Sequence, residues 1–139
     1  MYDYYKQFKG KKNDSMINMA SVFAEIVMHR QVAYATSKGA IKQMTRVLVT
    51  EWAPYVRVNA LGPCVIETPL TRQVLSNKTW SENIRQRNVF RRFGKPEKVL
   101  GPAIFLVSDA SSLITGSLIL LDAGWHWFGG WTGLEHFED

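Results

Sequence analysis

Several residue types that mark particular classes of protein are rare in this sequence. One cysteine, Cys64, occurs in 139 residues, so no internal disulfide can form, and a lone thiol is typical of a chain that works in the reducing cytosol. The three histidines, His29, His126 and His136, stand far apart, without the spacing of a metal site. We therefore expect a cytoplasmic protein that holds no metal.

Long apolar runs are also missing. No stretch approaches the ~20 apolar residues that a membrane-spanning helix needs. The first twelve residues are polar and basic and lack the apolar core of a secretory signal. Neither an internal repeat nor a low-complexity segment interrupts the chain. These observations predict a protein without a membrane partner.

Charge of both signs is present in moderate amounts. Lysine and arginine number 17 against 12 aspartates and glutamates, which gives a net charge of +5. That excess permits an anionic ligand or a nucleic acid. The cations are scattered, however, apart from those at 6–12 and 85–92, and this indicates a solvated surface. Because no nucleic-acid-binding motif is found, we expect no nucleic-acid partner and keep a small basic nucleic-acid binder only as an alternative.

The sequence does contain enough apolar material for one domain. Apolar residues make up 46% of the chain, which suffices for a core, and an aromatic content of 12% argues against disorder. Apolar periodicity and helix-breaking residues predict the tail of a helix at 1–12, strands at 16–21, 56–61 and 118–121, a long helix at 32–52, a polar helical stretch at about 70–88 and a helix at about 96–108.

The order of these elements is strand, helix, strand, helix, strand, and it indicates a fold class. The strands are short and apolar without alternation, which is typical of parallel strands covered by helices on both faces. We therefore expect an α/β fold. In such sheets, ligands bind beyond the carboxyl ends of the strands. Ser21 ends the first strand and residues 62–68 follow the second, so both segments are expected at one rim of the sheet.

The start of the long helix carries a tyrosine and a lysine four residues apart. Tyr34 and Lys38 therefore lie on one face of the helix, one turn apart. An ammonium group stabilises a neighbouring phenolate, and such a tyrosine can give or take a proton in general acid–base catalysis. The hydroxyl of Ser21 would hold the oxygen whose proton is moved. On spacing alone, a solvated helix face is the commoner explanation.

Six segments, taken in order, resemble the pattern of the short-chain dehydrogenase/reductase family. They are Ser21, Tyr34 with Lys38, Val58-Asn59 with Pro63 and Thr68, Gly94-Lys95-Pro96-Glu97, the run from Ser108-Asp109 to Thr115-Gly116, and Asp122-Ala123-Gly124. The resemblance covers nearly all of the chain from Ser15 to Trp125. It implies the C-terminal part of a Rossmann-like doubly wound parallel sheet whose N-terminal nucleotide-binding half is missing. The chain is then a single truncated domain, with a helix tail at 1–12, a catalytic half at 15–125 and an aromatic C-terminal tail at 126–139.

The resemblance implies an activity and a catalytic set. The activity is that of an NAD(P)-dependent oxidoreductase that interconverts an alcohol and a carbonyl in a small-molecule substrate. Tyr34 would be the proton donor or acceptor to the substrate oxygen. Lys38 would assist the tyrosine and hydrogen-bond the nicotinamide ribose, and Ser21 would orient the carbonyl or alcohol.

The same resemblance implies the cofactor, NAD or NADP, and the residues that bind it. Backbone groups near Ile66 would hold the nicotinamide carboxamide, and Thr68 would reach toward the amide or the phosphate. The cofactor-binding residues are then Tyr34, Lys38, Pro63, Cys64, Ile66 and Thr68. The arginines at 85–92 are expected on a solvated face, with an anionic substrate or the phosphate of NADP as alternative ligands.

The sequence also departs from the family pattern. No glycine-rich turn occurs before the first strand, so the backbone N–H groups that would hold a pyrophosphate are not found in these 139 residues. The asparagine that the family uses in catalysis would precede Met1. Cys64 stands where the family has a glycine that passes close to the cofactor, and Ala123 replaces a second glycine.

These departures leave a second interpretation open, that of a catalytically inactive remnant acting as an interaction module. The strand at 16–20 would have an open apolar edge, which is a template for pairing with another chain such as a full-length related subunit. A homo-oligomer would also cover part of this surface. For the catalytic interpretation, the segments at 60–63 and 67–70 resemble those of gluconate and other sugar-acid dehydrogenases.

Overall fold

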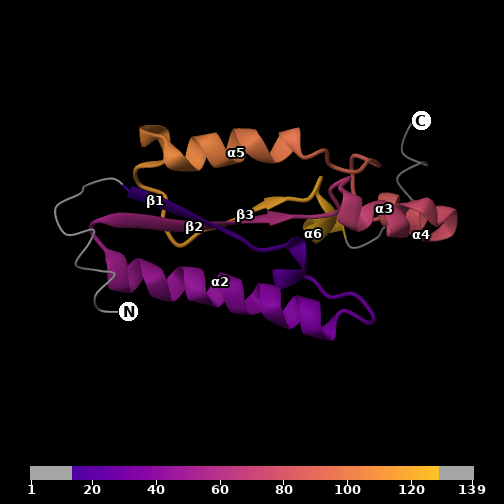
Figure 1. Cartoon of the computed structure of the whole chain (residues 1–139), viewed down its shortest axis with the longest axis horizontal. Helices are drawn as coiled ribbons and strands as arrows, with labels where there is room; N and C mark the ends of the chain where they lie inside the picture. The colour runs from indigo at the N-terminus through magenta and orange to yellow at the C-terminus, as the bar shows by residue number, and fades with distance from the viewer. Residues whose placement is uncertain (1–13, 129–139) are drawn as a thin grey trace, which may run out of the picture.

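The computed structural model describes residues 14–128, which form a three-stranded sheet between helices (Figure 1). The strands are β1 (Asp14–Met19), β2 (Val56–Pro63) and β3 (Leu118–Leu121), in the spatial order β1-β2-β3. Both pairings are parallel, which confirms the predicted α/β class. The helix tail expected at 1–12 and the last eleven residues of the aromatic tail lie outside the described residues.

The central strand β2 is the most deeply buried element. It pairs with β1 from Val56 opposite Asp14 to Leu61 opposite Met19, and with β3 over Ala60 to Pro63. Side chains on both of its faces are buried, because a helix covers each face. The strand is two residues longer than predicted, since Gly62 and Pro63 continue the pairing with β3. β1 starts two residues before its predicted limit and ends at Met19.

Helix α2 (Val32–Trp52) covers one face of the sheet, and its predicted limits are confirmed. It buries Thr45, Leu48 and Trp52, and the last two pack with Val56 and Val58 of β2. The backbone leaves the helix at Ala53, because Pro54 follows and a residue before proline is driven away from the helical conformation.

Helix α5 (Glu97–Val107) covers the opposite face (Figure 1). Leu106 is its one buried residue. A short 3₁₀ turn, η2 (Asp109–Ser111), follows it and leads to β3. Arg57 of β2 ties this turn to the sheet, since its Nη1 donates to the Ser111 carbonyl at 3.0 Å and to the Ser111 hydroxyl at 2.8 Å.

The polar stretch predicted at 70–88 is two helices instead of one. They are α3 (Pro69–Ser76) and α4 (Lys78–Arg85), divided at Asn77. The Asn77 side chain accepts a hydrogen bond from the Trp80 amide at 3.0 Å and so begins α4, as asparagine often does at helix starts. Two further short elements, η1 (Val22–Ala24) and α6 (Trp125–Phe128), lie with α3 and α4 beyond the carboxyl ends of the strands (Figure 1).

Candidate functional site

Ser21 lies two residues beyond the end of β1 and is only 4% exposed. Its side-chain oxygen accepts a hydrogen bond from the Phe23 amide at 3.2 Å, which caps η1. Its hydroxyl also reaches the Pro63 carbonyl at 3.4 Å. The serine therefore joins the end of β1 to the end of β2, the two segments that were expected to share a rim.

Tyr34 and Lys38 occupy the first two turns of α2. The Lys38 Nζ donates to the Met19 carbonyl at 3.0 Å and lies 5.5 Å from the centroid of the Tyr34 ring. Tyr34 is 43% exposed, and its hydroxyl has no hydrogen-bond partner among the described residues. The lysine ammonium therefore stands between the tyrosine ring and the end of the strand that leads to Ser21.

Four residues that the motif did not include hold this arrangement together. The ring of Phe23 meets the Tyr34 ring edge-on, at 6.1 Å between centroids, and meets Trp125 in the same way at 5.7 Å. Two residues later, Glu25 forms an ion pair with Lys42 of α2 at 2.6 Å. Lys42 follows Lys38 by one helical turn, so it lies on the helix face that carries Tyr34 and Lys38, and this spacing could have indicated it. Nothing in the sequence indicated that its partner is Glu25.

The segment after β2 is fixed by a short parallel bridge between Ile66 and Gly94. Gly94 donates to the Val65 carbonyl at 3.0 Å and accepts from the Glu67 amide at 2.9 Å. The Ile66 carbonyl accepts from the Thr71 hydroxyl at 2.6 Å, whereas the Ile66 N–H has no partner among residues 14–128. The bridge therefore presents one free backbone donor at the position expected to hold a carboxamide.

Thr68 is the N-cap of α3. Its side-chain oxygen accepts from the Thr71 amide at 3.4 Å, and the Thr71 hydroxyl accepts from the Thr68 amide at 2.9 Å. This reciprocal capping box occupies the threonine that was expected to reach the cofactor. A hydroxyl keeps further hydrogen-bonding capacity beyond one accepted bond, so the cap alone does not prevent a ligand contact.

The thiol of Cys64 lies half-buried beside an apolar cluster formed by Ile84, Phe93 and Trp125. Burial raises the pKa of the Cys64 thiol to about 11, with a smaller contribution from the negative charge of Asp122. The sulfur contacts the Val65 carbonyl at 4.0 Å. Such a thiol stays protonated and is a poor nucleophile.

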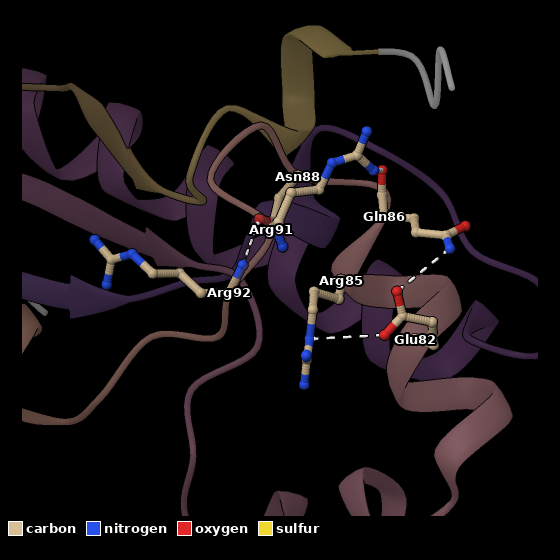
Figure 2. Close-up of polar contacts among 6 residues, drawn as sticks. All are labelled: Glu82, Arg85, Gln86, Asn88, Arg91 and Arg92. Carbon is tan, nitrogen blue, oxygen red and sulfur yellow. Dashed lines mark hydrogen bonds and ion pairs between the residues drawn. The ribbon is translucent and has the colours of Figure 1, made fainter. Parts of the chain in front are cut away.

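Of the arginines at 85–92, Arg85, Arg91 and Arg92 have side chains that leave the backbone in different directions (Figure 2). Arg85 makes a 3.9 Å ion pair with Glu82, and the Arg92 amide donates to the Asn88 side chain at 3.2 Å. Arg91 donates to the Gln86 carbonyl at 2.6 Å. Arg85, Arg91 and Arg92 nevertheless line one surface hollow of about 580 Å³, together with Lys95 and Lys98.

Known proteins share the sequence and the fold of this chain. The sequence profile of a family described as enoyl-(acyl carrier protein) reductase matches residues 3–126, which is most of the chain. The chain belongs to the short-chain dehydrogenase/reductase family. It is 45% identical over 111 residues to an NAD-dependent glycerol dehydrogenase of Listeria innocua, covering 79% of this chain and 43% of that one.

Two further members of the family show its range. A 2-dehydro-3-deoxy-D-gluconate 5-dehydrogenase of Dickeya dadantii is 37% identical over 123 residues, which cover 88% of this chain and 47% of that one. A gluconate 5-dehydrogenase of Burkholderia cenocepacia, solved with NADP and tartrate, superposes with a TM-score of 0.81 at 29% identity, covering 89% of this chain and 48% of that one. The chain thus spans about half the length of these relatives.

The sequence predicted neither a membrane-spanning helix nor a metal site, and residues 14–128 can be searched for both. No helix between residues 14 and 128 is long and apolar enough to cross a lipid bilayer. Over the same range, no three histidine, cysteine, aspartate or glutamate side chains gather closely enough to hold a metal ion.

Proposed function

We propose that this chain carries the proton-transferring half of an NAD- or NADP-dependent oxidoreductase that interconverts an alcohol and a carbonyl. The observation that supports this most strongly is the position of the Lys38 ammonium, which contacts the Tyr34 ring and the Met19 carbonyl together. A helix face and a strand end, placed independently by the fold, thereby converge two residues from Ser21. A solvated helix face would not require that convergence.

The available donors fit the nicotinamide end of such a cofactor. Lys38 uses one of its three N–H donors on Met19, so two remain for ribose hydroxyls. We propose that the free Ile66 N–H donates to the carboxamide oxygen, as the family resemblance implies. Pro63, Cys64 and Thr68 complete the set that we propose for cofactor binding.

The proposed chemistry divides between the cofactor and the protein. The nicotinamide ring, when bound, exchanges a hydride with the substrate carbon. In the reducing direction, the Tyr34 hydroxyl gives its proton to the carbonyl oxygen, and in the oxidising direction the phenolate takes that proton back. Lys38 supplies positive charge beside the phenol, and Ser21 donates a hydrogen bond that orients the substrate oxygen.

Small polyols, sugars and sugar acids are the substrate class that we propose. The names of the relatives support this, since one acts on glycerol and two act on gluconate derivatives. A cytoplasmic location is part of the same proposal and rests on the single cysteine.

Titration of the purified chain with NADH and NADPH tests the proposal, with nicotinamide fluorescence as the readout for binding. Turnover with a polyol panel is then compared between the wild type and Tyr34→Phe. We expect Tyr34→Phe to lower kcat by about 10²–10⁴-fold, because general acid–base catalysis contributes that much. Thr36→Ala, exposed on the same turn of α2, is the matched control and should retain kcat.

Two results of this experiment would contradict the proposal. A folded chain that binds no cofactor at millimolar concentration, or one whose turnover survives Tyr34→Phe, would contradict the proposed function.

A second candidate function is that of an interaction module, which pairs with a full-length related subunit or with another copy of the chain. Among the described residues, no strand covers the outer edge of β1. On α5, Leu100, Ile104 and Val107 are 59%, 65% and 57% exposed, although they are apolar. Sedimentation of the chain alone and mixed with a full-length relative tests this candidate, and a monomer in both experiments would exclude it.

A further inference from the structure

A hollow of about 510 Å³ lies between helix α4 and the connection that leads from η1 to α2. Val27, Met28, His29, Arg30 and Gln31 line it from the connection, Trp80, Asn83 and Ile84 line it from α4, and Arg87 lines it from the turn that follows α4. The connection runs from the turn that Ser21 caps to the helix turn that carries Tyr34. The hollow is therefore flanked along the chain by both proposed catalytic residues, and its size suits a small ligand.

The charges around this hollow are of one sign. Arg30 and Arg87 reach it from separate elements, and no carboxylate is among the residues that line it. The two nearest acidic residues in the sequence are engaged elsewhere. Glu25 pairs with Lys42, and Glu82 contacts Arg85 and Gln86 (Figure 2). An anion entering the hollow thus meets two guanidinium groups without a competing carboxylate in the lining.

The backbone and the polar amides add to this character. Arg30 has a φ of 64°, a left-handed conformation that is uncommon outside glycine and is concentrated at functional sites. Gln31 begins α2 without using its side chain as a cap, so its amide remains available. Asn83 contributes a second amide from α4. Amide groups of this kind suit the hydroxyls of a polyol.

One wall of the hollow is aromatic and continues toward Tyr34. Trp80 and Ile84 belong to the apolar cluster that includes Phe23. Phe23 in turn meets the ring of Tyr34 edge-on. A ligand that packs its apolar C–H groups on Trp80 is therefore linked to Tyr34 through the side chain of Phe23.

We propose that this hollow binds the carboxylate end of a polyhydroxy-acid substrate, with Arg30 and Arg87 as the specificity-determining residues. The inference rests on the proposed function and names its substrate class. Two N–H donors of a guanidinium can pair with the two oxygens of a carboxylate, a geometry that lysine does not offer. Neither Ser21 nor Tyr34 lines the hollow, so the acid end is held apart from both proposed catalytic residues, and the secondary hydroxyl or ketone that reacts must belong to the rest of the substrate.

The test measures binding directly, so that it does not depend on turnover. The indole N–H resonance of Trp80, assigned with Trp80→Phe, is followed by NMR while D-gluconate or the neutral polyol D-glucitol is added. The two probes differ in the carboxylate group. We expect gluconate to bind at least about 10-fold more tightly, because hydrogen bonds to a charged group contribute more than neutral ones.

Three variants assign the preference to the two arginines. Arg87→Gln and Arg30→Asn should each lower gluconate affinity by about 10-fold or more while leaving glucitol binding unchanged. Asparagine is chosen at position 30 because it tolerates the left-handed conformation. Arg46→Gln, an exposed arginine of α2 away from the hollow, is the matched control and should leave both affinities unchanged.

The outcomes separate this proposal from the proposed function. Equal affinity for gluconate and glucitol, or a preference that survives Arg87→Gln and Arg30→Asn, would overturn the carboxylate site even if the chain turns over polyols. Selective gluconate binding at Trp80 by a chain that binds no cofactor would support the site and contradict the oxidoreductase function.

Discussion

The two helices that cover the sheet differ in how many side chains they bury. On one face, α2 buries Thr45, Leu48 and Trp52 and is joined to β1 by side-chain hydrogen bonds. On the other face, α5 buries Leu106 alone. Each helix also leaves four large apolar side chains exposed: Leu100, Ile104, Phe105 and Val107 on α5, and Val32, Tyr34, Met44 and Val47 on α2. Both helices cover the same strands, so the difference lies in what each helix contributes.

The face covered by α2 is the one that carries the proposed catalytic residues. Asn18 Nδ2 donates to the Thr45 hydroxyl at 3.0 Å, and Thr45 donates to the Ile41 carbonyl at 2.8 Å. Lys38 bonds the Met19 carbonyl on the same side. A catalytic side chain must be positioned within a fraction of an ångström, and such hydrogen bonds give it rigid support.

The largest expected effect comes from a matched pair on α5. Leu106→Ala should lower the free energy of unfolding by about 2–5 kcal/mol, because Leu106 is fully buried and the change leaves a cavity. Ile104→Ala, at a position that is 65% exposed, should change it by less than about 0.5 kcal/mol. Urea denaturation of both variants measures the difference. An equally large loss for Ile104→Ala would mean that this face is covered in solution and would favour the interaction module.

A smaller effect is expected on the α2 face. Thr45→Val keeps the shape of the side chain but removes the partner of the Asn18 amide, so it should lower the free energy of unfolding by about 1–3 kcal/mol. Thr50→Val is the control, because Thr50 makes a similar bond to the Val47 carbonyl but is exposed. Comparable urea midpoints for the two variants would show that the Asn18–Thr45 link does not stabilise this face.

The smallest effect concerns Cys64, which lies beside the apolar cluster at the carboxyl edge. Since its pKa is about 11 instead of the ordinary 9.0, the native chain at pH 8 should hold roughly a hundredfold less thiolate than an unfolded one. Iodoacetamide labelling should therefore be correspondingly slower in the native state than in urea. The raised pKa stabilises the fold below about pH 9, and this contribution should be lost as the pH rises to about 11. Equal labelling rates would show that the thiol is exposed.

Much of the fold could be predicted from local patterns. The limits of α2 follow from a proline-free amphipathic run ended by Pro54, and both are confirmed. Parallel pairing follows from short apolar strands separated by helices, and it is confirmed as well. The division at Asn77 was missed, because the whole polar stretch has helical propensity and only the cap on Trp80 shows where the second helix begins.

The candidate site was predictable in part. The spacing of Tyr34 and Lys38 places them on one helix face, and Ser21 follows from the end of the strand. The assignments of Phe23 and Glu25 were not accessible, because their partners lie 11 and 17 residues further along, on a different element. Side chains so placed meet only when the helix has packed on the sheet, and no local periodicity records that contact.

The sequence by itself determined the elements, their parallel arrangement and the chemistry of the Tyr34–Lys38 pair, because each depends on spacing within a few residues. The tertiary structure decided which helix buries more side chains, where the ammonium of Lys38 points and which cations share the hollow beside α4. Those properties depend on distances between segments that are far apart along the chain, and such distances are set only when the core has packed.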